Sequence, residues 1–171
     1  MIKAGIIGMG GMGHMHFGVY ADIKNVDVVA LADVEADRVK PGESTEEINI
    51  GGGEVSIDPD KQSLYTDPED LIADEDVELV DICLPTFLHA EYAIKAIQAG
   101  KHVLCEKPMA MNREECDRMV EAATEAEGHL MIAQCIRFWP EYVYLKETVD
   151  SGRLGQLKSG EFWRGGPTPT W

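Results

Sequence analysis

The sequence predicts an α/β fold, in the form of a doubly wound parallel sheet, and three observations lead to this class. Apolar runs rich in β-branched residues recur along the 171-residue chain. Helix-like stretches with recognisable caps separate these runs. The runs are apolar throughout, as in parallel strands that helices cover on both faces, rather than alternating as in a half-exposed sheet.

The expected elements alternate from the N-terminus onward. We expect strands over residues 2–7, 26–33, 77–85, 102–107 and 130–135, with a shorter strand ending near residue 65. We expect helices over residues 12–23, 88–99, 112–127 and 142–149, with another beginning near residue 67. This alternation predicts a parallel sheet, because parallel neighbours need a long crossover connection, which is usually a helix.

Local signals support the helix ends. Asp67 is a favoured N-cap, and Pro68 suits the first helical position because its missing N–H would lack a partner there. Gly100 is typical of the residue that ends a helix. Asn112 followed three residues later by Glu115 matches the capping-box pattern.

Two regions depart from the alternation. Residues 38–62 hold Gly51-Gly52-Gly53 between short alternating apolar segments, such as Ile48 and Ile50, which predicts a small inserted hairpin. The triple glycine lacks the Lys-Ser/Thr of a phosphate-binding loop, so we interpret it as a turn. Residues 156–166 predict a new strand. We therefore expect a first domain over residues 1–150 and, over 151–171, the beginning of a second α+β domain that the chain does not complete.

The composition narrows the possible functions. The chain has 15 Lys and Arg against 31 Asp and Glu, a formal net charge of −16, which disfavours nucleic acid and membrane surfaces as partners. Cys83, Cys105, Cys116 and Cys135 form no C-x-x-C pair, which indicates free thiols rather than disulfides or a zinc site. The apolar stretch at the N-terminus is too short for a signal peptide, so we expect a cytoplasmic protein.

A glycine motif gives the first functional signal. Gly8-Met9-Gly10-Gly11-Met12-Gly13 fits G-x-G-x-x-G between a predicted strand and a predicted helix. In a dinucleotide-binding Rossmann domain the first glycine permits the turn, the second lets the backbone approach a pyrophosphate, and the third lets the helix pack closely on the strand. The alternative is a glycine-rich turn without a ligand.

An acid at the end of the second strand completes the fingerprint. Asp33 lies 20 residues beyond Gly13, where a carboxylate accepts hydrogen bonds from the adenosine ribose. A carboxylate there repels a 2′-phosphate, so we expect NAD rather than NADP. Arg38 could hold that phosphate, but we interpret it as a solvated helix residue.

Polar residues at other predicted strand ends are further candidates. His14 and His16 are two residues apart on a helix and so lie on different faces, which argues against a metal pair. His89 opens a helix near a strand end, where a capping or packing role and a binding role stay open. Lys107 stands before a proline at the carboxyl end of its strand, where it could hold a substrate hydroxyl, with Glu106 as its partner; the alternative is a surface lysine.

These stretches resemble a known family. The segments GIIGMGGMGHMH, LPTFLHAEYAIKAIQAGKHVLCEKPMA and RFWPEYVYLKETVDSGRLGQL are similar to the Gfo/Idh/MocA oxidoreductases, which include glucose–fructose oxidoreductase and inositol dehydrogenase. The E-K-P triplet after that helix is the most specific part. The resemblance implies an N-terminal Rossmann domain, a C-terminal α+β domain with an open sheet that often mediates oligomers, and a nicotinamide cofactor.

The resemblance also implies roles for single residues. It implies that Lys107 lies beside the nicotinamide and the reacting carbon, with a cis bond to Pro108. It places Pro85, Thr86 and His89 along the nucleotide. It further assigns Arg137 and Pro140 to a hinge by the cleft, His16 to the histidine after the glycine turn, and Arg164 and Trp171 to the start of the second domain.

Two departures from the family pattern bear on these roles. Leu84 stands where many members have threonine, which puts one ribose contact in doubt. The family's catalytic aspartate and histidine of the C-terminal domain would fall beyond residue 171. The insert at 38–62 is also atypical of the family.

Two hypotheses follow. The first is an NAD-dependent oxidoreductase of sugars or polyols, a homo-oligomer in its full-length form, for which this chain supplies the cofactor-binding half and is inactive alone. The second is a dinucleotide-binding module without catalysis, such as a sensor or a partner-dependent subunit. The candidate catalytic residue is Lys107, no metal site is expected, and the candidate cofactor-binding residues are Gly8, Gly10, Gly11, Met12, Gly13, Asp33, Pro85, Thr86, His89, Glu106, Lys107 and Arg137.

Overall fold

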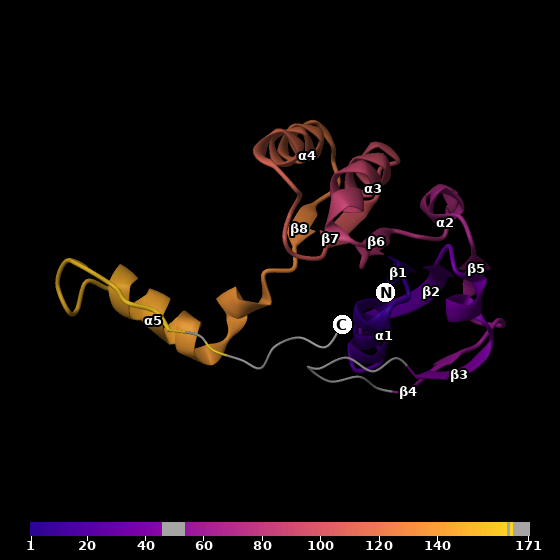
Figure 1. Cartoon of the computed structure of the whole chain (residues 1–171), viewed down its shortest axis with the longest axis horizontal. Helices are drawn as coiled ribbons and strands as arrows, with labels where there is room; N and C mark the ends of the chain where they lie inside the picture. Colours follow the sequence, from indigo (N-terminus) through magenta and orange to yellow (C-terminus); the bar gives the residue numbers. More distant parts are fainter. Residues whose placement is uncertain (46–53, 164, 166–171) are drawn as a thin grey trace. The chain divides into compact units, whose positions relative to one another are not determined.

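The computed structural model of the protein describes residues 1–45, 54–163 and 165 (Figure 1). Its contacts divide the chain into two compact units, Met1–Ala133 and Gln134–Trp171. The predicted domain boundary at residue 150 falls at the end of the last helix, inside the second unit, and stays a prediction.

The first unit is built on a six-stranded sheet in the order β5-β2-β1-β6-β7-β8, in which every pairing is parallel. The strands are β1 Ile2–Ile7, β2 Val26–Ala32, β5 Ser63–Tyr65, β6 Leu79–Ile82, β7 His102–Cys105 and β8 Leu130–Ile132. The chain adds β2 and β5 on one side of β1, and then β6, β7 and β8 on the other. This is the strand order of doubly wound dinucleotide-binding domains, with the switch point between β1 and β6, and it confirms the predicted fold class.

Four α-helices accompany this sheet, and two of them begin directly after the predicted N-caps. The helices are α1 Gly11–Tyr20, α2 Pro68–Ala73, α3 Thr86–Gln98 and α4 Arg113–Glu125, together with the 3₁₀ helix η1 Ala36–Val39. Asp67 accepts the N–H of Glu69 at 2.9 Å at the start of α2. Asn112 accepts the N–H of Glu115 at 2.9 Å at the start of α4. Both predicted N-caps are therefore confirmed.

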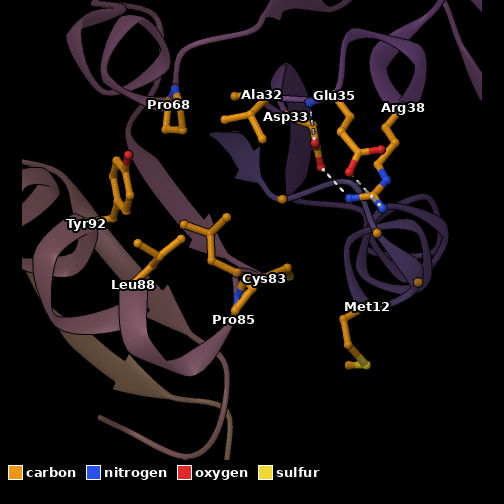
Figure 2. Close-up of a pocket in the computed structure, with 15 residues that line it drawn as sticks. Met12, Ala32, Asp33, Glu35, Arg38, Pro68, Cys83, Pro85, Leu88 and Tyr92 are labelled. Carbon is orange, nitrogen blue, oxygen red and sulfur yellow. Dashed lines mark hydrogen bonds and ion pairs between the residues drawn. The ribbon is translucent and has the colours of Figure 1, made fainter. Parts of the chain in front are cut away.

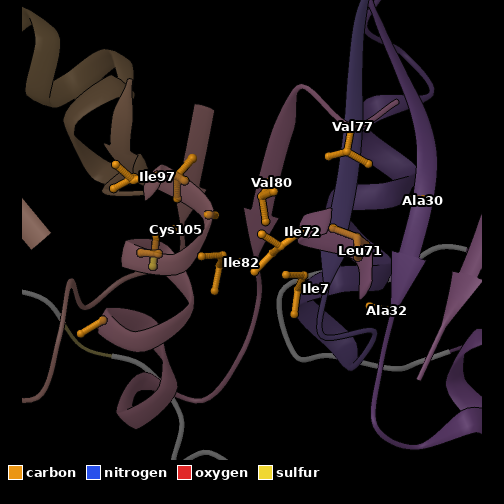
Figure 3. Close-up of a cluster of buried hydrophobic side chains, with 14 of the residues drawn as sticks. Ile7, Ala30, Ala32, Leu71, Ile72, Val77, Val80, Ile82, Ile97 and Cys105 are labelled. Atoms are coloured by element: carbon orange, nitrogen blue, oxygen red, sulfur yellow. The ribbon is translucent and has the colours of Figure 1, made fainter. Parts of the chain in front are cut away.

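Helices cover both faces of the sheet, so the core has two clusters. Ile6 and Ile7 are neighbours on β1 and enter different clusters, because successive side chains of a strand point to opposite faces. The larger cluster holds side chains from α2, α3 and α4 against the sheet (Figure 3). The smaller one joins α1 to the other face. These clusters fix the strand ends that carry the candidate site.

The insert contains a hairpin, as predicted. Strands β3 Gly42–Thr45 and β4 Glu54–Ile57 pair antiparallel, with Gly42 opposite Ile57. Ile57 is buried in the cluster beside α1, so the hairpin is attached to the domain by its second strand. The predicted strand residues Ile48 and Ile50 and the triple glycine at 51–53 lie outside the described residues.

The second unit holds a 3₁₀ helix, η2 Cys135–Phe138, and the helix α5 Pro140–Asp150. Within it, Arg153 donates to the hydroxyls of Tyr144 at 2.7 Å and Thr148 at 2.8 Å, which ties the segment after α5 back to the helix. The strand predicted over 156–166 is wrong for its described part, since residues 156–163 have no regular structure. A strand needs a neighbour for its N–H and C=O groups, and no strand of the described chain pairs with this segment. Among the described residues, no helix has the length and apolar character needed to cross a bilayer.

Candidate functional site

The candidate site begins where β1 and β6 end side by side. The N–H of Gly8 donates to the carbonyl of Ala32 at 2.8 Å, and the N–H of Cys83 donates to the carbonyl of Ile7 at 2.8 Å. These bonds hold the glycine turn between the ends of β2 and β6. In open parallel sheets the crevice at such a switch point is where ligands bind.

The glycine turn is closed on the protein side and open on the other. Gly8 has a φ of +93°, and a Cβ there would lie 2.7 Å from the carbonyl oxygen of Cys83. A Cβ on Gly13 would lie 2.0 Å from the carbonyl oxygen of Gly8, so a side chain cannot fit between α1 and the turn. A Cβ on Gly10 would meet nothing within 4 Å. The turn is therefore closely packed at Gly8 and Gly13 but has room for a ligand at Gly10.

That free space belongs to a cavity of about 450 Å³ at the switch point. Figure 2 shows Asp33 and Arg38 on one wall and Leu88 and Tyr92 on the facing wall. The residues around it come from the glycine turn, the end of β2, η1, the end of β6 and helices α2 and α3; they are Gly8, Gly10, Gly11, Met12, Ala32, Asp33, Val34, Glu35, Arg38, Pro68, Cys83, Leu84, Pro85, Leu88 and Tyr92.

Asp33 is the acceptor on the first wall. It is 5% exposed, and its two carboxylate oxygens accept the N–H groups of Met9 at 2.7 Å and Glu35 at 2.9 Å. Each carboxylate oxygen can accept a second hydrogen bond, so Asp33 can still receive hydroxyl groups of a ligand. Arg38 lies 3.6 Å from Asp33 and 3.5 Å from Glu35. Arg38 lies on the 3₁₀ helix η1 with its side chain 37% exposed, and its guanidinium also pairs with these two acids on the cavity wall.

The facing wall is apolar and was missed by the sequence analysis. Pro68 begins α2, while Leu88 and Tyr92 lie four residues apart on α3 and so share one face of the helix. Leu84 also lines the cavity, and its side chain offers no hydrogen bond. This wall suits a flat apolar ring system better than a charged group.

The E-K-P turn lies at the same sheet edge, after β7. The N–H of Glu106 donates to the carbonyl of Ile82 at 3.0 Å, which continues the β6–β7 ladder to the turn. Glu106 then accepts the backbone N–H of Lys107 at 3.0 Å, and the Lys107 ammonium lies 3.8 Å from the same carboxylate oxygen. The Lys107 side chain is 59% exposed. The Lys107–Pro108 bond is cis, as the resemblance implies.

A half-buried histidine, His16, connects α1 to that turn. His16 Nδ1 lies 2.8 Å from Oδ2 of Asp81, which is fully buried on β6, and His16 Nε2 lies 3.3 Å from Oε1 of Glu106. The Tyr20 hydroxyl donates to the same oxygen of Asp81 at 3.0 Å. The sequence analysis matched His16 to the family's histidine after the glycine turn but did not find its two acidic partners, which come from β6 and from the turn after β7.

The charges in this cluster stabilise one another. Burial disfavours a charged ring, but the hydrogen bonds to Asp81, Cys83 and Glu106 outweigh it and raise the pKa of His16 to about 12. Burial likewise opposes ionisation of Glu106, yet the hydrogen bonds from His16 and from the Lys107 backbone hold the pKa of Glu106 below its usual value. Burial, reinforced by Asp81, raises the pKa of the Cys83 thiol to about 12, so the thiol stays protonated.

A metal ion is a poor fit for the same cluster. Within the described part of the chain, His16, Asp81 and Cys83 offer ligand atoms within 4.8 Å of one another. A ligating histidine must be neutral at the coordinating nitrogen, and a ligating cysteine must be a thiolate. The hydrogen bonds favour a charged His16 and a protonated Cys83, so the cluster is satisfied without a metal.

His89 is buried beside the turn rather than in the cavity wall. Its Nδ1 lies 2.8 Å from the carbonyl oxygen of Pro108, and its Nε2 lies 2.8 Å from that of Leu84. The ring therefore bridges the segment after β6 and the segment after β7. These contacts give His89 a structural role between the two segments, and its role in binding a nucleotide stays a prediction.

The structure brings most of the predicted site residues to one sheet edge. Gly8, Gly10, Gly11, Met12, Asp33 and Pro85 line the cavity. Gly13 packs behind it, Thr86 begins α3, and His89, Glu106 and Lys107 surround the neighbouring turn. Arg137 belongs to η2 of the second unit, and Arg164 and Trp171 lie outside the described residues.

Comparison with known proteins agrees with this geometry. Residues 2–134 match the family described as an oxidoreductase family with an NAD-binding Rossmann fold, Gfo/Idh/MocA. Myo-inositol 2-dehydrogenase of Thermotoga maritima is 32% identical over 155 residues, which cover 91% of this chain and 42% of that protein. Inositol 2-dehydrogenase of Salmonella typhimurium is 35% identical over 157 residues, 91% of this chain and 43% of that protein. The chain thus spans less than half the length of these curated relatives.

The solved structures give the same result for the fold. The crystal structure of a probable dehydrogenase from Thermotoga maritima has a TM-score of 0.74 and 30% identity to this chain, and the match covers 90% of this chain and 42% of that one. An NAD-binding oxidoreductase from Klebsiella pneumoniae has a TM-score of 0.72 at 28% identity, with 90% and 40% covered. The chain therefore belongs to the Gfo/Idh/MocA family of oxidoreductases with an NAD-binding Rossmann fold.

Proposed function

We propose that the protein is an NAD-dependent oxidoreductase that moves a hydride between nicotinamide and a carbinol carbon of a sugar or polyol. One observation carries this proposal: the glycine turn, the cavity and the E-K-P turn with Lys107 share the edge of the sheet at the switch point. A site for the cofactor alone would not require a lysine at this edge. The cofactor and a reacting hydroxyl group can meet there.

The residues around the cavity fit NAD. The open side of the turn at Gly10 would receive the pyrophosphate, where the unpaired N–H groups at the start of α1 favour an anion. Asp33 would accept the ribose hydroxyls. The apolar wall with Leu88 and Tyr92 would pack against a ring of the nucleotide. When bound, NAD supplies the carbon that accepts or donates the hydride.

Lys107 would act on the substrate. Its ammonium is exposed and its backbone N–H is held by Glu106, so the side chain can reach a hydroxyl at the edge of the cavity. In this role it holds the substrate oxygen and stabilises negative charge that develops when the proton leaves. We propose that the groups that remove this proton lie outside residues 1–171, as the family resemblance implies.

The substrate class rests on the relatives. Two curated proteins that match most of this chain are named as inositol dehydrogenases, at 32% and 35% identity. We propose a cyclic polyol or a sugar as the substrate, and a cytoplasmic homo-oligomer as the complete protein. The acidic net charge of −16 argues for a neutral rather than an anionic substrate.

The test uses the complete protein, NAD⁺ and a panel of sugars and polyols that includes myo-inositol, with NADH absorbance as the readout. We expect NADH formation with at least one member of the panel. Lys107→Met should lower turnover by about a hundredfold or more, the range expected for loss of a group that acts on the reacting oxygen. Lys24→Met, before β2 at the opposite edge of the sheet, is the control and should leave turnover unchanged. Tight NADH binding without turnover on any member would instead favour a non-catalytic dinucleotide-binding module.

A further inference from the structure

We propose that His16 is a positioning residue, which acts through Glu106 to fix the direction in which Lys107 leaves the end of β7. This inference rests on the proposed role of Lys107 in the reaction and assigns a function to the buried cluster beside the cofactor cavity. His16 does not line the cavity, although its Nδ1 lies 3.5 Å from the Sγ of Cys83, which does. Its link to Lys107 passes through Glu106.

The two oxygens of Glu106 face different partners. Oε2 accepts the backbone N–H of Lys107 at 3.0 Å and lies 3.8 Å from the Lys107 ammonium. Oε1 lies 3.3 Å from His16 Nε2. A carboxylate held at both oxygens cannot rotate about its last bond, so the position of Oε2, and with it the start of the Lys107 side chain, depends on His16.

His16 is itself held from its other nitrogen. Nδ1 lies 2.8 Å from Asp81, whose carboxylate is fully buried and also accepts the Tyr20 hydroxyl at 3.0 Å. The Cys83 thiol lies 3.7 Å from the second oxygen of Asp81. The ring therefore joins α1, β6 and the turn after β7.

The charges favour this positioning role over simple packing. A neutral imidazole has one N–H and could donate to only one of the two acids, whereas the protonated ring donates to both. The cluster also makes Glu106 sensitive to His16, because burial alone would raise the pKa of a carboxyl group and the bond from His16 opposes this. The titratable groups that face Glu106 are His16 from α1, Cys83 directly after β6, Cys105 at the end of β7 and Lys107 from the same turn.

Loss of His16 should change the pH dependence of turnover through Glu106. Glu106 works as a carboxylate, and in the native protein it stays ionised below its usual pKa of 4.5. His16→Gln removes the charged donor but leaves the burial, so the pKa of Glu106 should rise and the acid limb of the turnover profile should move to higher pH by about one unit or more. A packing defect would lower turnover at all pH values without moving this limb.

The experiment compares four variants of the complete protein: His16→Gln, Glu106→Gln, the double variant, and the control His102→Gln. His102 lies at the opposite end of β7, where its ring accepts the N–H of His129 at 3.1 Å, a bond that glutamine can keep. We expect His16→Gln to lower kcat by about tenfold or more, to move the acid limb, and to change the Kd of NADH less than twofold. The control should change none of these.

The double variant tests the path of the effect. If His16 acts through Glu106, adding His16→Gln to Glu106→Gln should change kcat less than twofold, because the group it acts through is already neutral. Full additivity of the two single effects would overturn the proposal. An unmoved acid limb in His16→Gln would also overturn it.

Two further variants cover a folding failure of His16→Gln and separate this inference from the proposed function. If His16→Gln does not fold, Asp81→Asn removes the acid that holds the ring from its other side and should move the same limb in the same direction; an unmoved limb there counts against the proposal. Lys107→Met separates this inference from the proposed function. Unchanged turnover in Lys107→Met refutes the role of Lys107 itself, whereas lost turnover in Lys107→Met with native behaviour in His16→Gln refutes only the role of His16.

Discussion

Replacing single glycines of the turn should separate folding from cofactor binding. In Gly13→Ala the new Cβ would lie 2.0 Å from the carbonyl oxygen of Gly8, whereas ordinary contacts begin near 3.4 Å. Helix α1 and the turn would have to part by about 1.4 Å, the difference of these two distances. Because the obstacle is backbone and cannot rotate away, we expect a loss near the upper end of overpacking costs, roughly 3 kcal/mol.

Gly10→Ala is the matched variant, because it adds the same methyl group at a position where nothing lies within 4 Å. We expect its stability to stay within about 1 kcal/mol of the native value, while its NADH affinity falls about tenfold or more, since the methyl occupies the space left for a pyrophosphate. Thermal unfolding and NADH fluorescence titration measure the two effects. Equal stability of the two variants would refute the close packing at Gly13, and native NADH affinity in Gly10→Ala would refute the pyrophosphate position.

Three other outcomes follow from the described contacts. In a fluorescence titration NADH should bind more tightly than NADPH. Asp33→Ala should weaken NADH binding and reduce the difference between the two affinities; an unchanged preference would remove Asp33 from the ribose site. Asn112→Ala removes the N-cap of α4 and should cost about 1 kcal/mol in urea unfolding, so an unchanged midpoint would contradict the cap. Iodoacetamide at pH 8 should modify the exposed Cys135 in the native protein but spare Cys83 and Cys105, whose pKa values burial raises to about 12; rapid labelling of either one, mapped by mass spectrometry, would contradict their environment.

Local patterns were enough for most of the fold. Strand β1 spans the predicted residues 2–7. Its prediction worked because a strand covered on both faces has a nearly continuous apolar sequence. The caps at Asp67 and Asn112 were predictable because each depends on a side chain and a backbone N–H two or three residues away. The predicted strand is absent from residues 156–163, because strand formation depends on a neighbouring strand, which a local pattern cannot supply.

The site was predictable only in part, for a related reason. The glycine turn and Asp33 belong to one strand–helix–strand unit with fixed spacing, so the sequence alone brought them together. Leu88 and Tyr92 reach the cavity only because β6 lies next to β1 in the sheet. The partners of His16 come from two further strands. One signal was available, since Asp81 is an acid within an apolar strand and a buried carboxylate needs partners.

The most direct test of the proposed reaction follows the hydride itself. The complete protein is supplied with NAD⁺ and the polyol or sugar of the panel that gives turnover, carrying deuterium on its carbinol carbons. If the substrate carbon and nicotinamide meet beside Lys107, the NADH formed should carry one deuterium at C4, on a single face, as seen by NMR. NADH without deuterium, or no turnover with any member of the panel, would contradict direct hydride transfer at this site.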